Sequence, residues 1–196
     1  MLEMIRGCNV KKCDQLCEQY EIEANGITAN VNASKIERLL REFINMQTER
    51  LFFILEIPVN RQREDELRKS NTDPFHNEVY YIDGLSKEDA LMLLSEYGEL
   101  LIHDGVTKFG FGVHDSSAEI MCCKYNVIKI WAKEPKKFVQ LFSKMDIPFA
   151  EHCKTAWETF DENNPGDSWS ISINNMKVYD LIGSLKNLGL YLAEIR

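Results

Sequence analysis

Two histidines that are each followed directly by an aspartate are the residues of this sequence that most directly suggest chemistry. They are His103 with Asp104 and His114 with Asp115. A histidine changes charge near neutral pH, and a neighbouring carboxylate can orient it or share a metal ion with it. The same residues are typical of turns, because Asp104 precedes a glycine and Asp115 precedes two serines. We favour the turn interpretation over catalysis.

The spacing of the two pairs limits what they could form together. They flank a predicted strand at Val106–Val113, and along a straight chain their α-carbons would lie ~30 Å apart at ~3.3 Å per residue. A single site could therefore include only one of the two pairs, unless a bend in the chain or a second copy of the protein places the other pair nearby. A hydrolase or ligand-binding protein with its site around one such pair, with or without a metal, is our alternative functional hypothesis.

The six cysteines do not have the spacing of a metal site or of a disulfide scaffold. The first three are five and four residues apart, without the C-x-x-C pattern of structural zinc sites. The side chains of Cys122 and Cys123, which are neighbours in the sequence, would point to opposite sides of a strand. We predict no metal site and expect free thiols, with no cysteine nucleophile favoured. The cysteines are Cys8, Cys13, Cys17, Cys122, Cys123 and Cys153.

Glycine-rich phosphate loops are absent from the sequence. Gly110 and Gly112 form a G-x-G, but no third glycine follows and no helix is predicted after them. We expect these glycines to let an aromatic side chain of a neighbouring strand pack over them. No Walker A motif and no nucleophile elbow occur. The sequence predicts no cofactor.

Aromatic and acidic residues gather in the last third of the chain. Residues 151–167 contain five acidic side chains and one lysine, a net charge of −4. A solvated loop would explain this composition, but acidic groups beside tryptophans also suit a surface that holds a basic protein. The residues that we predict for such a binding surface are Trp157, Glu158, Asp161, Glu162 and Asp167.

The overall composition is that of a soluble globular protein. The chain has 196 residues, of which 44% are hydrophobic and 28% charged, with a net charge of −8. This charge disfavours nucleic acid as a partner. The start of the chain does not resemble a signal peptide, and the apolar run Leu51–Val59 is short and interrupted by Glu56. We therefore predict a cytoplasmic protein without a membrane partner.

Hydrophobic periodicity predicts four strand–helix–strand units that begin near residues 27, 79, 127 and 169. The expected strands are 27–31, 51–57, 79–82, 106–113, 127–132, 154–160, 169–173 and 190–195. The expected helices are 9–20, one from Asn32 or from Ser34, the latter with Glu37 in a capping box, one from Ser86 to Gly98, one from Pro135, and one around 178–185. We predict an α+β fold, ferredoxin-like in character, with helices on one face of a mixed or mostly antiparallel sheet.

A polar segment at 60–77 is the longest expected loop. We interpret residues 1–196 as a single domain, with two pseudo-repeated halves as an open alternative: 1–59 plus the loop 60–77, then 78–196. The last strand, Leu190–Ile195, could lie at a sheet edge and pair with a second copy, so a homo-oligomer is a further hypothesis.

These features favour a protein-binding function over an enzymatic one. We expect a non-enzymatic cytosolic module of bacterial type that binds an unknown, basic protein partner. A toxin-neutralising immunity protein is one concrete version, since such proteins are small, acidic and free of catalytic motifs. That likeness is one of general character and depends on no motif.

Overall fold

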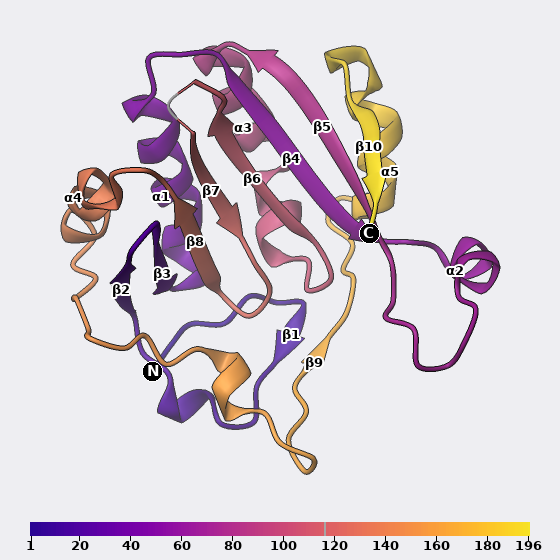
Figure 1. Cartoon of the computed structure of the whole chain (residues 1–196), viewed down its shortest axis with the longest axis horizontal. Helices are drawn as coiled ribbons and strands as arrows, with labels where there is room; N and C mark the ends of the chain where they lie inside the picture. The colour runs from indigo at the N-terminus through magenta and orange to yellow at the C-terminus, as the bar shows by residue number, and fades with distance from the viewer. Residues whose placement is uncertain (116) are drawn as a thin grey trace.

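The computed structural model describes residues 1–115 and 117–196, which form an α+β fold (Figure 1). Ser116, part of the turn predicted after Asp115, lies outside the described residues. In the described chain, eight strands form one sheet, here called the large sheet, in the order β10-β5-β4-β6-β7-β8-β3-β2. All its neighbouring strands pair antiparallel, so the antiparallel form of the prediction is confirmed. The ferredoxin-like repetition is not confirmed.

The elements have the following bounds. The strands of the large sheet are β2 (Gln19–Glu23), β3 (Gly26–Asn30), β4 (Leu51–Pro58), β5 (Asn77–Leu85), β6 (Lys108–Val113), β7 (Ala118–Cys122), β8 (Val127–Trp131) and β10 (Tyr191–Ile195). A small sheet pairs β1 (Cys8–Asn9) with β9 (Asp167–Ser168). The α-helices are α1 (Ala33–Met46), α2 (Arg61–Leu67), α3 (Lys87–His103), α4 (Val139–Ser143) and α5 (Val178–Ser184). The 3₁₀ helices are η1 (Cys13–Gln15), η2 (Pro135–Phe138), η3 (Ala156–Thr159) and η4 (Leu185–Leu188).

The core lies between the large sheet and the helices α1 and α3, which Figure 1 shows together behind the sheet. Strand β6 shows how the residues are divided between the two faces. Phe109, Phe111 and Val113 belong to this core, whereas Gly110 and Gly112 face the other way. The alternation predicted for this strand is confirmed, and the core side of the sheet is the side that carries the helices.

Helix α1 forms because one of its faces is apolar. Its predicted capping box does not form: the Ser34 hydroxyl donates to Glu3 instead, and Glu37 pairs with Arg41 one turn later. The helix begins after Asn32, whose side-chain oxygen accepts from the backbone N–H of Glu3. The buried apolar side chains of the helix are Ala33, Ile36, Leu39, Leu40, Phe43 and Ile44.

Helix α3 begins as predicted and ends later than predicted. The Ser86 hydroxyl oxygen accepts from the Asp89 backbone N–H at 3.0 Å, and the Asp89 carboxylate accepts from Ser86, which is a complete capping box. The helix continues past Gly98 to His103. Burial of Leu100, Leu101 and Ile102 stabilises the additional turn, and this outweighs the low helix propensity of one glycine.

Three predicted elements are wrong. Residues 9–20 form η1 and parts of β1 and β2 in place of a helix, and residues 169–173 are mostly irregular after β9. Residues 154–160 contain η3 in place of a strand, because Thr155 and Glu158 form a capping box that favours a helical turn. Strand β7 was not predicted, because its run of five residues is short and lies close to β6 and β8.

The polar segment 60–77 contains α2, whose first turn is capped by Asn60 through the backbone N–H of Arg63. Strands β4 and β5, which flank this segment, are neighbours in the large sheet. Strand β10 lies at one edge of that sheet and β2 at the other. Of the helices in the described chain, none has the length and apolar character needed to cross a membrane.

Candidate binding face

One face of the large sheet is not covered by α1 and α3, and we call it the open face. Cross-strand register places side chains from β10 to β2 in rows along it. One row runs through Tyr191, Tyr81, Ile54, Gly110, Met121, Lys129, Thr28 and Glu21. The neighbouring row runs through Phe52, Gly112, Glu119, Trp131, Gly26 and Glu23.

Three hollows along these rows form one groove across the sheet. The aromatic hollow, at the β10 side, has a volume of about 720 Å³, the central hollow about 480 Å³ and the outer hollow, toward β2, about 390 Å³. The first two share the lining residues Tyr81, Glu119 and Trp131. The second and third share Lys108, Cys123 and Lys129. Neighbouring hollows thus border the same side chains, and we call the three together the groove.

The two glycines of β6 lower the floor of this groove. A β-carbon at Gly112 would lie 2.3 Å from the ring of Phe52, and one at Gly110 would lie 2.7 Å from the sulfur of Met121. Because glycine has no side chain, Phe52 and Met121 can pack closely over these two positions of β6. The prediction that an aromatic of a neighbouring strand packs over these glycines is confirmed for Gly112, whereas Met121 takes that place at Gly110.

A buried ion-pair cluster lies in the central hollow. The Glu56 side chain, 4% exposed, accepts from Lys108 Nζ and from Arg196 Nη2, each at 2.7 Å. Burial would raise the pKa of Glu56, but the hydrogen bonds and charges of Lys108 and Arg196 lower it overall. Arg196, which follows β10, thus supplies a cation to a carboxylate of β4, and this contact holds β10 against the sheet.

Glu119 differs from Glu56 because no cation pairs with it. Among the described residues, no Lys, Arg or His nitrogen lies within 4.0 Å of its carboxylate. Burial raises the pKa of Glu119, while the more distant charge of Arg196 opposes this shift. Its cross-strand neighbour on β8 is Trp131. The open face therefore holds a half-buried carboxylate beside an aromatic ring.

His114 pairs with an aspartate from another strand. Its Nε2 atom lies 3.0 Å from Oδ1 of Asp83 on β5, and the Tyr191 hydroxyl donates to the other oxygen of Asp83 at 2.6 Å. Both hydrogen bonds lower the pKa of Asp83, and the bond from Tyr191 has the larger effect. The His114 ring lies 4.8 Å from the ring of Phe52. The predicted partner Asp115 is exposed in the turn after β6, so the structure places His114, without Asp115, at the aromatic hollow.

The other predicted pair, His103 and Asp104, lies at the end of α3. Asp104 is buried, and His103 Nδ1 accepts from the backbone N–H of Arg6 at 3.3 Å. Burial, assisted by the charge of Arg6, lowers the pKa of His103. Asp104 accepts hydrogen bonds from Val106 N, Thr107 N, Thr107 Oγ1, Ser170 Oγ and Ile171 N. These contacts join the turn after α3 to residues 170–171, and neither residue of the pair is among the described residues that line the groove.

Two of the predicted binding residues, Trp157 and Glu158, line the outer hollow of the groove. The exposed Trp157 ring packs edge-on against Tyr125 and Phe160, with ring centroids 5.0 and 5.5 Å away. Glu158 accepts from the Thr155 backbone N–H at 2.7 Å and lies 2.6 Å from His152 Nε2. His152 therefore offsets part of the negative charge of Glu158.

The other three predicted binding residues lie outside the groove. Asp161 accepts from Lys12 Nζ at 2.6 Å, and bonds from Lys12, Asn164 and Asn163 lower the pKa of Asp161 to about 2. Glu162 is exposed in the turn that follows. Asp167 is exposed on β9, where it pairs with Asn9. The structure thus divides the predicted acidic surface, and Lys12 cancels part of its charge.

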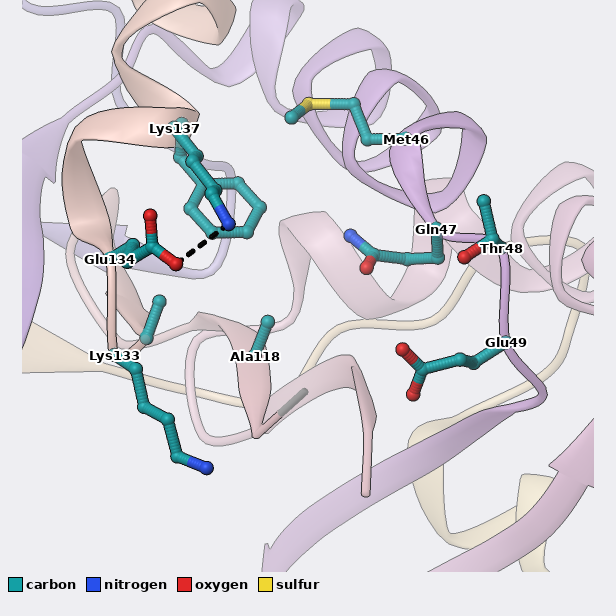
Figure 2. Close-up of a pocket in the computed structure, with 10 residues that line it drawn as sticks. Met46, Gln47, Thr48, Glu49, Ala118, Lys133, Glu134 and Lys137 are labelled. Atoms are coloured by element: carbon teal, nitrogen blue, oxygen red, sulfur yellow. Dashed lines mark hydrogen bonds and ion pairs between the residues drawn. The ribbon is translucent and has the colours of Figure 1, made fainter. Parts of the chain in front are cut away.

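A separate hollow of about 350 Å³ lies where α1 ends near η2 (Figure 2). In Figure 2, one side of this hollow is lined by Gln47, Thr48 and Glu49, and the other side by Lys133, Glu134 and Lys137. Glu134 and Lys137 form an ion pair at 2.8 Å. The Gln47 side chain donates to the Phe43 backbone oxygen. Acidic and basic groups are balanced around this hollow, and it gives no preference for a ligand.

The cysteines are free thiols dispersed over the fold. Burial raises the pKa of Cys8 to about 11 and that of Cys153 to about 12, so both are protonated at neutral pH. In the described part of the chain, no group of three or more His, Cys, Asp or Glu side chains is arranged to hold a metal ion.

Comparisons with protein-family models, with curated proteins and with solved structures found no match to this chain. The residues that the fold brings together carry the functional argument on their own. Sequence reasoning missed several of them, including Glu119 and Tyr191. The available signal was the period of two in the strands, since these residues occupy the positions that alternate with core residues.

Proposed function

We propose that this protein is a non-enzymatic cytoplasmic protein-binding module and that its partner binds on the open face. The observation that carries the proposal is the groove, which lies on the face of the large sheet opposite α1 and α3. An antiparallel sheet can leave one face to solvent, but a solvated face is normally polar. This one carries the rings of Phe52, Tyr81, Trp131 and Tyr191 around one hollow, which is typical of a surface that a partner covers.

The exposed rings along the groove support a macromolecular partner. Trp131 is 43% exposed, Tyr191 48% and Trp157 53%, and they lie in the aromatic and outer hollows. Tryptophan and tyrosine dominate the energetics of protein interfaces because they bury large areas with few rotatable bonds. The groove also extends across most strands of the large sheet, which favours an extended contact over a single small ligand.

Charge supports a basic partner. The chain carries a net charge of −8. In the outer hollow Glu21, Glu23 and Glu158 are balanced by Lys108, Lys124 and Lys129, so the support comes from the net charge of the whole chain. A negative net charge accelerates association with a positively charged protein. A toxin-neutralising immunity protein is a concrete member of this class, and its open face would then cover the toxin.

A matched pair of substitutions tests the proposal. Trp131→Lys places a charge in the groove, whereas Met92→Lys places one at a similarly exposed site (52%) on α3. Tagged wild-type chain and both variants are isolated from the producing cells, and the co-purifying proteins are quantified. We expect one protein to accompany the wild type and Met92→Lys and to fall about tenfold with Trp131→Lys.

The thermal unfolding midpoints of the three proteins provide the folding control. Equal retention of the partner by both variants, with unchanged unfolding, would contradict binding on the open face. Loss with Met92→Lys alone would place the partner on the helical side and would also contradict it.

A further inference from the structure

The aromatic hollow has a lining that suits an organic cation. Four aromatic rings surround it, from Phe52, Tyr81, Trp131 and Tyr191. Its described lining also includes the imidazole of His114 and two carboxylates but no lysine or arginine. The faces of aromatic rings carry negative potential and attract cations. The lysines of the open face line the central and outer hollows instead.

The two carboxylates differ in what they offer a ligand. Asp83 is occupied by Tyr191 and His114, which hold it in place. Glu119 has no such partner among the described residues, although it is half buried beside Trp131. A buried carboxylate without a cation is costly, and a ligand that supplies the cation would remove this cost. An anionic ligand would meet two like charges and is excluded on the same grounds.

The pairing of an aromatic ring with a carboxylate in this hollow favours a planar cation. A guanidinium can lie flat on an aromatic ring while its N–H groups bond a carboxylate in two places, whereas an ammonium is a compact and strongly hydrated charge. Glu119 and Trp131 are adjacent across β7 and β8, so one group can contact both. Building on the proposed function, we infer that the aromatic hollow receives an arginine side chain of the protein partner.

Short capped peptides test this inference without the natural partner. The probe is acetyl-Gly-Arg-Gly-amide, and its control replaces arginine with citrulline, which has the same shape without the charge. Binding is followed through the Trp131 indole N–H in two-dimensional NMR spectra. We expect the arginine probe to bind with a dissociation constant on the order of millimolar and the citrulline peptide to leave the signal unmoved. A lysine probe should bind more weakly.

Glu119→Gln should weaken the arginine probe about fivefold or more, because it removes the charge and keeps the shape. Glu134→Gln, in the separate hollow beside α1, is the matched control and should bind normally. Equal shifts with citrulline, or unchanged binding by Glu119→Gln, would overturn the inference. Tighter binding of tetramethylammonium than of the arginine probe would also overturn it, in favour of a small-molecule site.

The inference and the proposed function can fail separately. If Trp131→Lys abolishes partner binding and the arginine probe does not bind, the open face is an interface and the arginine assignment is wrong. If the probe binds and both lysine variants retain the partner, the hollow binds cations but the open face is not the partner surface.

Discussion

His152 and His103 show how the same side chain acquires opposite properties in this fold. His152 is exposed between two glutamates, and its hydrogen bond to Glu158, with a smaller contribution from Glu21, raises its pKa. His103 is partly buried at the end of α3, where burial and the charge of Arg6 lower its pKa. The sequence shows four histidines but not their surroundings, because Glu21 and Arg6 are distant from these histidines in the chain.

NMR titration of the histidine side chains should separate the two. We expect His152 to titrate above the ordinary value of about 6.5 and His103 below it. Glu158→Gln should lower the pKa of His152 and leave His103 unchanged. The His152 interaction stabilises the fold at pH values below about 6.5 and is lost as pH rises through the higher folded pKa. Titration of His152 at or below 6.5 in the wild type would contradict this account.

The ion pair of Glu56 with Lys108 should contribute measurably to stability. Lys108→Met leaves a buried carboxylate with one cation and is expected to lower the free energy of unfolding by about 2 kcal/mol. Lys137→Met removes an exposed pair with Glu134 and should cost less than about 1 kcal/mol. Urea unfolding at neutral pH measures both, and equal losses would show that Glu56 does not depend on its pair.

Acidification provides a second readout of the same pair. Because the pKa of Glu56 is lower in the folded protein, its contribution is present above the unfolded value of about 4.3 and is lost as pH falls through the folded pKa. The stability difference between the wild type and Lys108→Met should therefore shrink below about pH 4. A difference that stays constant to pH 2 would contradict this assignment.

Among the elements, β6 has the tightest constraint on sequence. Gly112→Ala would place a methyl group 2.3 Å from the Phe52 ring and 2.9 Å from the Ala118 backbone oxygen, and we expect a loss of about 2 kcal/mol in the free energy of unfolding. Gly183→Ala, in α5, meets no atom within 4 Å and should be neutral or stabilising by up to about 1 kcal/mol. Thermal and urea unfolding of both variants measure the contrast, and a harmless Gly112→Ala would show that the ring is free to move away.

Local signals predicted some elements well and others not at all. The capping box of Ser86 and the strand predicted at 190–195 are both local, and the structure confirms them. The end of α3 depends on burial against the rest of the fold, which a glycine in the sequence does not reveal. The short turn at Thr155–Glu158 carried its own capping signal, which the apolar alternation around it concealed.

At the scale of the whole molecule, the net charge of −8 is not concentrated on one acidic surface. Lys12 pairs with Asp161, and Lys11 donates to the backbone oxygen of Asn163, although both lysines are about 150 residues away in the chain. Sequence reasoning could not place these cations. It also could not place the groove, which arises from strand order and register: Tyr191, from the last strand, reaches Tyr81 only because β10 joins β5. The antiparallel sheet with one open face was predictable, whereas the residues assembled on that face were not.

The most direct measurement is photo-crosslinking from within the groove. A benzophenone amino acid replaces Trp131 in one variant and Met92 in another, and adducts formed in the producing cells are identified by mass spectrometry. We predict a covalent adduct with a second, different protein from position 131 and none from position 92. Adducts from both positions alike, from position 92 alone, or only between two copies of this chain would contradict the assignment of the open face as the partner-binding surface.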